Sequence, residues 1–146
     1  MGRGDESMGR RDARRRRGVA AVELALILPV LITIVLGCVD FGRFAHTHIA
    51  VTNAARVGAA YGAVTPVTPN TQNTWEEKLR ERVVAEMGDG FNPELIVVDP
   101  PVITIEADNL RRVRVQVSYP FQMLVDWPLL PGSITLTRAV EMRVIR

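Results

Sequence analysis

Hydrophobic positions are concentrated in one run near the start of the chain. The run extends from Val19 to Val39 and contains a single charged residue, Glu23. At about 1.5 Å per helical residue, a segment of this length covers the ~30 Å hydrocarbon core of a bilayer. We therefore predict a transmembrane helix over residues 19–39. Pro29 removes one backbone donor inside this helix, which predicts a kink or a local loss of helix.

The residues before the run are polar and basic. Residues 1–18 hold seven arginines and only three acidic residues, and they are too polar to bury a core, so we expect an unfolded leader. Arginines beside a span favour the cytoplasmic side of the membrane. We therefore predict three parts: a basic cytoplasmic leader (1–18), the transmembrane helix (19–39) and an extracytoplasmic domain (40–146).

The helical pattern continues beyond the span. No proline occurs between Asp40 and Ala63, and apolar residues recur there at three- and four-residue spacing. We expect the same helix to run on out of the membrane. One face carries small side chains that would let a sheet pack closely against it: Ala54, Ala55, Gly58, Ala59, Ala60 and Gly62.

A second, shorter helix is predicted after a loop rich in proline and threonine. Thr74 with Glu77 three residues later has the pattern of a capping box, and Gly88 or Gly90 would end the helix. An apolar stripe at helical spacing would face the core, and it consists of Trp75, Leu79, Val83, Val84 and Met87.

Alternating apolar residues predict strands in the last third of the chain. Pro120 is expected either to end the third strand or to mark an edge. The apolar segment from Phe121 to Gly132 is interpreted as a loop that folds onto the core or lies against a membrane or partner. The predicted strands are Leu95–Val98, Val102–Glu106, Arg112–Tyr119 and Ile134–Ile145, with Arg138 the exception to the alternation of the last one. The fold class is α+β, with a three- or four-stranded antiparallel sheet covered by helices.

Charge and cysteine content exclude two classes of protein. The net charge is +2, whereas residues 1–18 alone carry +4, so the remainder of the chain is weakly acidic. The basic charge therefore belongs to the leader, and no nucleic-acid surface is expected. Cys38 is the only cysteine, which excludes an intrachain disulfide.

The sequence contains no recognisable catalytic constellation. No glycine-rich phosphate loop follows a strand, and no serine lies beside a plausible base. We therefore expect no enzymatic activity and no cofactor. His46 and His48 are two positions apart on a helix and should point to different sides, so no metal site is expected.

The junction at the start of the apolar run resembles the processing site of type IV prepilins. In those proteins a membrane peptidase cuts after the glycine, which implies cleavage between Gly18 and Val19 and makes Glu23 the fifth mature residue. A carboxylate inside the hydrocarbon is costly and needs a cationic partner, which a freed α-amino group of the same or a neighbouring subunit would supply. The alternative is that Glu23 reaches the cytoplasmic interface near Arg17.

Four segments together resemble the TadE-like family, the pseudopilin-type membrane proteins of tight-adherence (Flp) pilus assembly. These segments are Gly18–Pro29, Gly37, Asp40–Arg43 and Thr52–Ala60. The resemblance implies a pilin-like domain, a single-pass inner-membrane location and processing by a prepilin peptidase. It also implies other pilins, pseudopilins and pilus assembly proteins as partners, in a tight-adherence pilus or a related secretion apparatus.

One competing interpretation remains open at this point. Val35–Cys38 resembles a lipobox, in which Cys38 would be acylated and the preceding segment removed. The chain would then be a lipid-anchored, or an uncleaved single-span, binding module that uses Phe121–Pro131. Without acylation, we expect Cys38 to be a packed, reduced thiol at the membrane edge.

Overall fold

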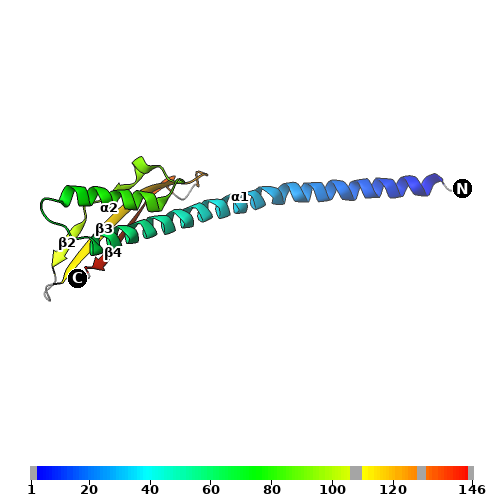
Figure 1. Ribbon diagram of the computed structural model, residues 1–146. Helices are drawn as coiled ribbons and strands as arrows, with labels where there is room; N and C mark the ends of the chain where they lie inside the picture. The colour runs from blue at the N-terminus through cyan, green and yellow to red at the C-terminus, as the bar shows by residue number, and fades with distance from the viewer. Residues whose placement is uncertain (1–2, 106–109, 128–130, 145–146) are drawn as a thin grey trace. The chain divides into compact units, whose positions relative to one another are not determined.

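The order of helices and strands is that of an α+β protein. The structure is a computed structural model that describes the backbone of residues 3–105, 110–127 and 131–144, with side chains from residue 18 onward in these ranges. The chain divides into two units, residues 1–41 and 42–146. The elements are α1 (Arg3–Val64), α2 (Gln72–Met87), the 3-10 helix η1 (Pro93–Leu95), β1 (Val97–Val98), β2 (Val102–Ile105), β3 (Arg111–Gln122) and β4 (Ser133–Arg143) (Figure 1). The predicted fold class is confirmed as an α+β, pilin-like arrangement with a long apolar N-terminal helix, a second helix and a four-stranded sheet.

The first unit is helical throughout its described residues. α1 begins at Arg3, so the expectation of an unfolded leader is wrong for the backbone of residues 3–17. A helix that already exists is extended at the gain of one hydrogen bond per residue, and arginine and alanine are good helix formers. The helix also continues through Pro29 without interruption, so the predicted local loss of helix is wrong and only the kink stays a prediction.

The sheet of the second unit is built around β3. β4 pairs with β3 along its length in antiparallel register, from Arg112↔Arg143 to Gln122↔Ser133. β1 and β2 are also antiparallel to β3, and because β4 occupies one edge, they lie one after the other along the opposite edge. Pro100 and Pro101 separate them. The predicted first strand is shorter than expected because Leu95 belongs to η1.

Pro120 lies inside β3, which continues to Gln122, so the prediction that it ends the strand is wrong. Odd-numbered residues of β3 exchange hydrogen bonds with β4, as the flanking bonds from Val144 N–H to Arg111 O (2.8 Å) and from Met123 N–H to Gly132 O (3.1 Å) show. The nitrogen of Pro120 therefore faces the other edge, where β1 has already ended at the pair Val97↔Ser118. The alternative prediction, that Pro120 marks an edge, is confirmed.

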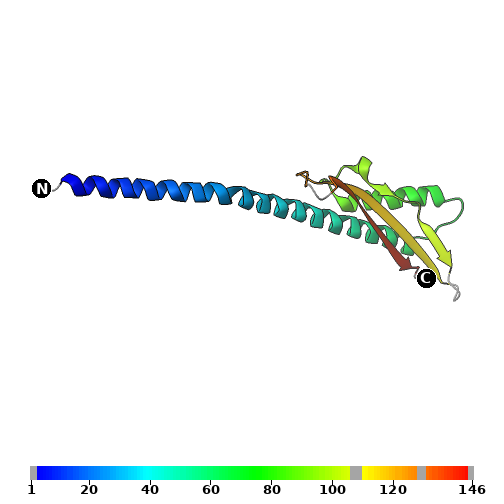
Figure 2. The same cartoon turned by 180° about the vertical axis from the view of Figure 1, so that it is seen from behind.

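The core lies between one face of this sheet and the two helices. The helices of this unit lie in front of the sheet in Figure 1, and the strands lie in front of the helices in Figure 2, which shows the molecule from behind. Val113, Val115 and Val117 of β3 are buried, as their alternation predicted. The small-residue face of α1 is confirmed for five of its six members, whereas Ala60 is exposed.

α2 carries the predicted stripe but starts differently. Trp75, Leu79, Val83 and Met87 are buried, and Gly88, with φ +80°, ends the helix. The helix begins at Gln72, so the predicted capping box at Thr74 is wrong. Thr71 is the N-cap without a side-chain bond to the helix, because its Oγ1 instead accepts a hydrogen bond from Thr68 N–H at 3.0 Å.

Three predicted features lie outside the described residues. They are the end of the second predicted strand at Glu106, residues 128–130 of the predicted loop and Ile145 at the end of the last predicted strand.

Truncation of Leu79 is expected to destabilise the second unit. This side chain is fully buried, and we predict that Leu79→Ala lowers the free energy of unfolding by about 3 kcal/mol through lost contacts and a cavity. Leu124→Ala is the control, because Leu124 is 63% exposed and should cost less than about 0.5 kcal/mol. Urea unfolding of the purified chain in detergent micelles, followed by tryptophan fluorescence, measures both. Equal midpoints for the two variants would contradict the assignment of Leu79 to the core.

Candidate functional site

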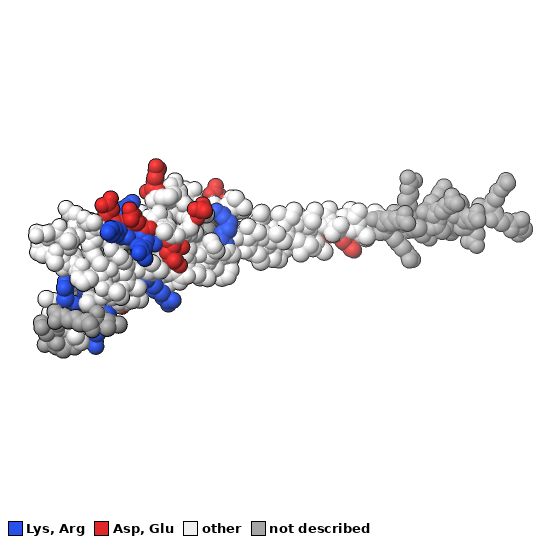
Figure 3. All heavy atoms as spheres, in the orientation of Figure 1, with Lys and Arg blue, Asp and Glu red and all other residues white. Residues whose placement is uncertain are grey.

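The apolar run of α1 is exposed along most of its length. Leu36 and Gly37 are partly buried, and the other residues of the run are exposed, with the large apolar side chains ranging from Val39 at 45% to Leu26 at 73%. No part of the most apolar stretch is buried within the protein, and Figure 3 shows this stretch of α1 as an uncharged surface apart from one acidic side chain. A core helix would hide such a surface. The described part of the chain thus has one N-terminal helix, within Gly18–Val64, that is long and apolar enough to span a membrane.

Gly18 has no packing role in the described structure. A Cβ added at this position would meet nothing within 4 Å, whereas one added at Gly58 would come within 2.8 Å of Val83 Cγ2. Glycine inside a helix costs about 1 kcal/mol relative to alanine. The fold therefore explains glycine at position 58 and gives no reason for it at position 18.

Glu23 lies in the apolar run one helical turn after Val19. The two residues are at positions i and i+4, so they share one face of α1 and are about 6 Å apart along its axis. The Glu23 side chain is exposed, and none of the side chains described from residue 18 onward forms an ion pair with it. The carboxylate is thus presented outward on an apolar helix.

Two other polar positions of the run differ in their bonding. The Thr33 hydroxyl donates to Pro29 O at 2.8 Å, which satisfies a donor that an apolar environment would otherwise leave unpaired. Cys38 is a free thiol and is exposed on the helix surface, so the predicted packing of this side chain is not found within the protein.

The two histidines point to different sides of α1, as their spacing predicted. The His46 ring stacks on Phe91 with centroids 5.7 Å apart and planes within 5° of parallel. His48 Nε2 accepts a hydrogen bond of 2.9 Å from Arg138 Nε. Arg138 breaks the apolar alternation of β4 because its guanidinium reaches α1. Within the described part of the chain, no group of three or more His, Cys, Asp or Glu residues could hold a metal ion.

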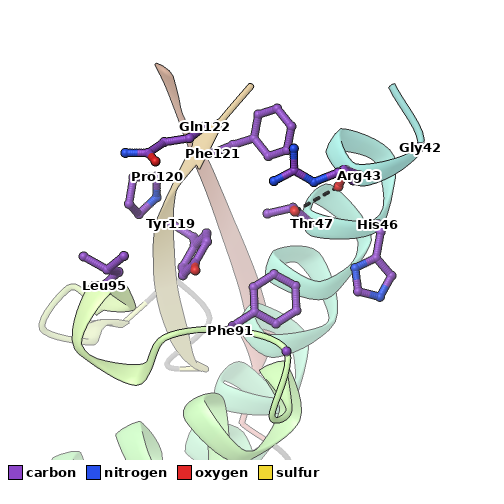
Figure 4. A pocket seen from close by; sticks show the side chains of 11 residues that line it. Gly42, Arg43, His46, Thr47, Phe91, Leu95, Tyr119, Pro120, Phe121 and Gln122 are labelled. Carbon is purple, nitrogen blue, oxygen red and sulfur yellow. Dashed lines mark hydrogen bonds between the residues drawn. The ribbon is translucent and has the colours of Figure 1, made fainter. Parts of the chain in front are cut away.

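The second unit contains an open groove that the sequence did not reveal. It has a volume of about 470 Å³ and lies between the first turns of α1 in this unit, the loop before η1 and the end of β3 (Figure 4). Four of its eleven lining residues carry an aromatic ring, and Arg43 is its only permanently charged side chain among the residues described. The lining is Gly42, Arg43, His46, Thr47, Gly90, Phe91, Leu95, Tyr119, Pro120, Phe121 and Gln122. Because these residues come from segments far apart in the chain, no local motif could have indicated the groove.

The segment predicted as a binding loop is only partly a loop. Phe121 belongs to β3 and is buried, with its ring in an edge contact with Phe44 at 5.6 Å. Leu124, which follows β3, is 63% exposed, whereas Trp127 is half-buried. Phe121, the first residue of the predicted binding loop, is therefore part of the core.

The same part of α1 that holds the exposed run also matches a known protein family. Residues 18–60 match the family model described as TadE-like protein. This chain carries a TadE-like domain. The predicted resemblance, whose segments run from Gly18 to Ala60, is confirmed, and the TadE-like domain begins at the glycine that packing does not explain. No curated protein and no solved structure matches the chain.

Proposed function

We propose that this TadE-like protein is a membrane-anchored pseudopilin or minor pilin that takes part in assembling a tight-adherence pilus or a related secretion apparatus. The observation that carries the proposal is the coincidence of the TadE-like domain with an exposed apolar helix. A helix of this kind is stable only in a bilayer or against other apolar helices, and a pilin-type subunit uses both environments in turn. TadE-like proteins are pilin-like structural proteins, so we propose no catalytic activity.

The proposed topology follows from charge. The arginines of residues 1–18 stay in the cytoplasm, residues 19–39 span the inner membrane, and residues 40–146 form the extracytoplasmic domain. The proposed partners are the membrane, other pilins or pseudopilins, pilus assembly proteins and a prepilin peptidase. Nucleic acid is not among them. Pro29 is proposed to kink the span, which neighbouring helices can accommodate.

Glu23 is proposed to act in assembly through its charge. Cleavage after Gly18 would create an α-amino group on Val19, one helical turn from the carboxylate. The same group on a neighbouring subunit would meet Glu23 when two apolar helices pack in parallel and slightly out of step. Each of these charges alone is costly in hydrocarbon, so an ion pair between them stabilises the packed helices. The pair forms only when the two helices are shifted by the matching distance, and pairing therefore favours one register between subunits.

The intact mass and N-terminal sequence of the protein from native membranes test the proposal. We expect a chain that begins at Val19. Substitution of Gly18 by valine is expected to leave the leader in place, because the resemblance assigns the cut to the bond after this glycine. Gly42→Val is the control, since an added Cβ meets nothing within 4 Å at either position.

Two other results would count against the proposal. A native chain that retains its arginine-rich leader would reduce the protein to a plain single-span anchor. A chain that begins with an acylated Cys38 would overturn the proposal and establish a lipoprotein, which is the lipid-anchored binding module considered above.

A further inference from the structure

One edge of the sheet in the second unit is open to pairing. β4 pairs with β3 over 11 successive residues without a bulge, and it contains neither proline nor glycine. Within the described part of the chain, no strand pairs with the other side of β4 (Figure 2). The opposite edge differs, because β1 has 2 residues, β2 has 4, and Pro100 and Pro101 separate them. Short strands and prolines keep a sheet edge from pairing with another chain, and β4 has neither protection.

The free side of β4 presents a regular row of backbone groups. Even-numbered residues of β4 exchange hydrogen bonds with β3, so the N–H and C=O groups of the odd-numbered residues point away from the sheet. These residues include Thr135, Thr137, Ala139 and Glu141, all of which are exposed. Their outward backbone groups form no bond with any described residue. An extended segment laid along β4 would pair with all four residues.

The core face of β4 determines which side chains such a segment must carry. On this face Ile134, Val140 and Met142 are only half-buried, at the edge where the sheet ends. An added strand would place one side chain opposite each of them, with Cβ atoms about 5 Å apart. Apolar side chains at alternate positions of the segment would therefore complete the burial of this face.

Arg138 determines the charge that the segment must carry. It is the one charged residue on the core face of β4, where Glu141 lies on the other face. Its Nε donates to His48 Nε2 at 2.9 Å, and its Nη2 also contacts this atom. The Nη1 group forms no bond with a described residue, and the side chain is exposed. A charge on the core face of an edge strand disfavours an apolar partner, whereas a carboxylate opposite Arg138 would accept a charge-assisted hydrogen bond.

We propose that the free edge of β4 binds an extended segment of a partner protein by strand addition. The segment carries an acidic side chain opposite Arg138, apolar side chains two and four positions to either side of it, and small polar side chains between them. A second copy of this chain fits less well, because the antiparallel register with the longest overlap of two β4 strands sets Arg138 against Arg138. The proposal does not depend on the proposed function, since every contact that it uses lies within the second unit.

A synthetic peptide tests this proposal. The probe, Ile-Thr-Val-Thr-Glu-Thr-Val-Thr-Ile, has the required alternation and reads the same in both directions. Its fluorescein-labelled form is titrated with the full chain in micelles of a neutral detergent, and binding is followed by fluorescence anisotropy. We expect it to bind about fivefold more tightly than the same peptide with lysine in place of glutamate. Arg138→Glu should reverse this preference, because the exposed side chain then carries the opposite charge.

Two substitutions of Ala139 test whether the peptide pairs with the backbone of β4. Ala139→Pro removes an N–H that points away from β3, and an edge strand tolerates proline at such a position. It should weaken binding of the glutamate peptide by at least about tenfold, because a hydrogen bond is lost and the ring blocks the edge. Ala139→Val keeps the N–H and should bind as the unchanged chain does. Equal binding by these two variants would overturn the proposal.

Each remaining outcome also decides the proposal. Absence of saturable binding by the glutamate peptide would overturn it, as would a preference that Arg138→Glu leaves unchanged. The charge reversal at Arg138 decides the question if circular dichroism shows that Ala139→Pro does not fold. A peptide-free dimer that Ala139→Pro dissociates would assign the edge to a second copy, which overturns the proposed partner. None of these results bears on the N-terminus of the native chain, so failure here is distinct from failure of the proposed function.

Discussion

Replacing Gly58 with leucine is expected to destabilise the second unit by about 3 kcal/mol, because overpacking forces side chains and backbone to move. A Cβ at this position would already lie 2.8 Å from Val83 Cγ2 and 3.1 Å from Val115 Cγ1. The new side chain would push both α2 and β3 away from α1. Thermal unfolding of the purified chain in detergent, followed by circular dichroism, should show a Tm lowered by roughly 15 °C.

Gly42→Leu is the matched control for this result. It makes the same chemical change in the same helix, at a position where an added Cβ meets nothing within 4 Å. Its Tm should stay unchanged or rise slightly, because leucine is the better helix former by nearly 1 kcal/mol. If both variants unfolded at the same temperature, the close approach of α1 to α2 and β3 at Gly58 would be wrong.

Replacing Glu23 with leucine is expected to abolish pilus assembly while improving insertion of the helix. The carboxylate is the only charge of the apolar run, and its removal should make insertion more favourable by up to about 3 kcal/mol. Assembly should nevertheless fail, because the ion pair with the Val19 amine that is proposed to set the register would be lost. The readouts are membrane abundance of the chain, co-purification of other pilins and pili counted by electron microscopy.

Two variants at the same site separate charge from shape. Glu23→Gln keeps the size of the side chain and should fail in assembly as the leucine variant does, whereas Glu23→Asp keeps the charge and should retain part of the activity. Normal pilus numbers with leucine at this position would show that Glu23 serves only to reach the interface. The protein would then behave as the single-span anchor considered above.

Several features of the fold could be predicted because they depend on local periodicity. The stripe of α2 and the alternation of β3 were predicted correctly, since a buried face repeats about every 3.6 residues in a helix and every two in a strand. The small residues of α1 were a sound indicator of close packing, and Gly58 and Gly62 meet neighbouring side chains as expected. Ala60 was the exception, because small size alone does not show which way a helical residue points.

Local patterns were wrong or incomplete where other contacts decided the outcome. Thr74 has a valid capping-box pattern, yet Thr71 bonds with Thr68 and the helix starts earlier. Pro120 was expected either to end β3 or to mark an edge, and the second holds, because its nitrogen faces an edge that β1 does not occupy. Arg138 looked like a break in β4, and it is a contact to His48 on α1. The extent of β1 decided the outcome for Pro120 and a contact between distant segments decided it for Arg138, whereas a bond within the preceding turn decided it for Thr74.

The sequence by itself determined the apolar run, its single carboxylate, the glycine before it and the TadE-like character of residues 18–60. These features are linear, because a helix in a bilayer satisfies its own hydrogen bonds and needs only length and hydrophobicity. The tertiary structure alone decided that Gly58 is required by packing and Gly18 is not, and it alone formed the groove around Arg43 and Phe121. Such features join residues that are far apart in the chain, such as Arg43 and Phe121, and only the packing of α1 against α2 and β3 brings them within contact distance.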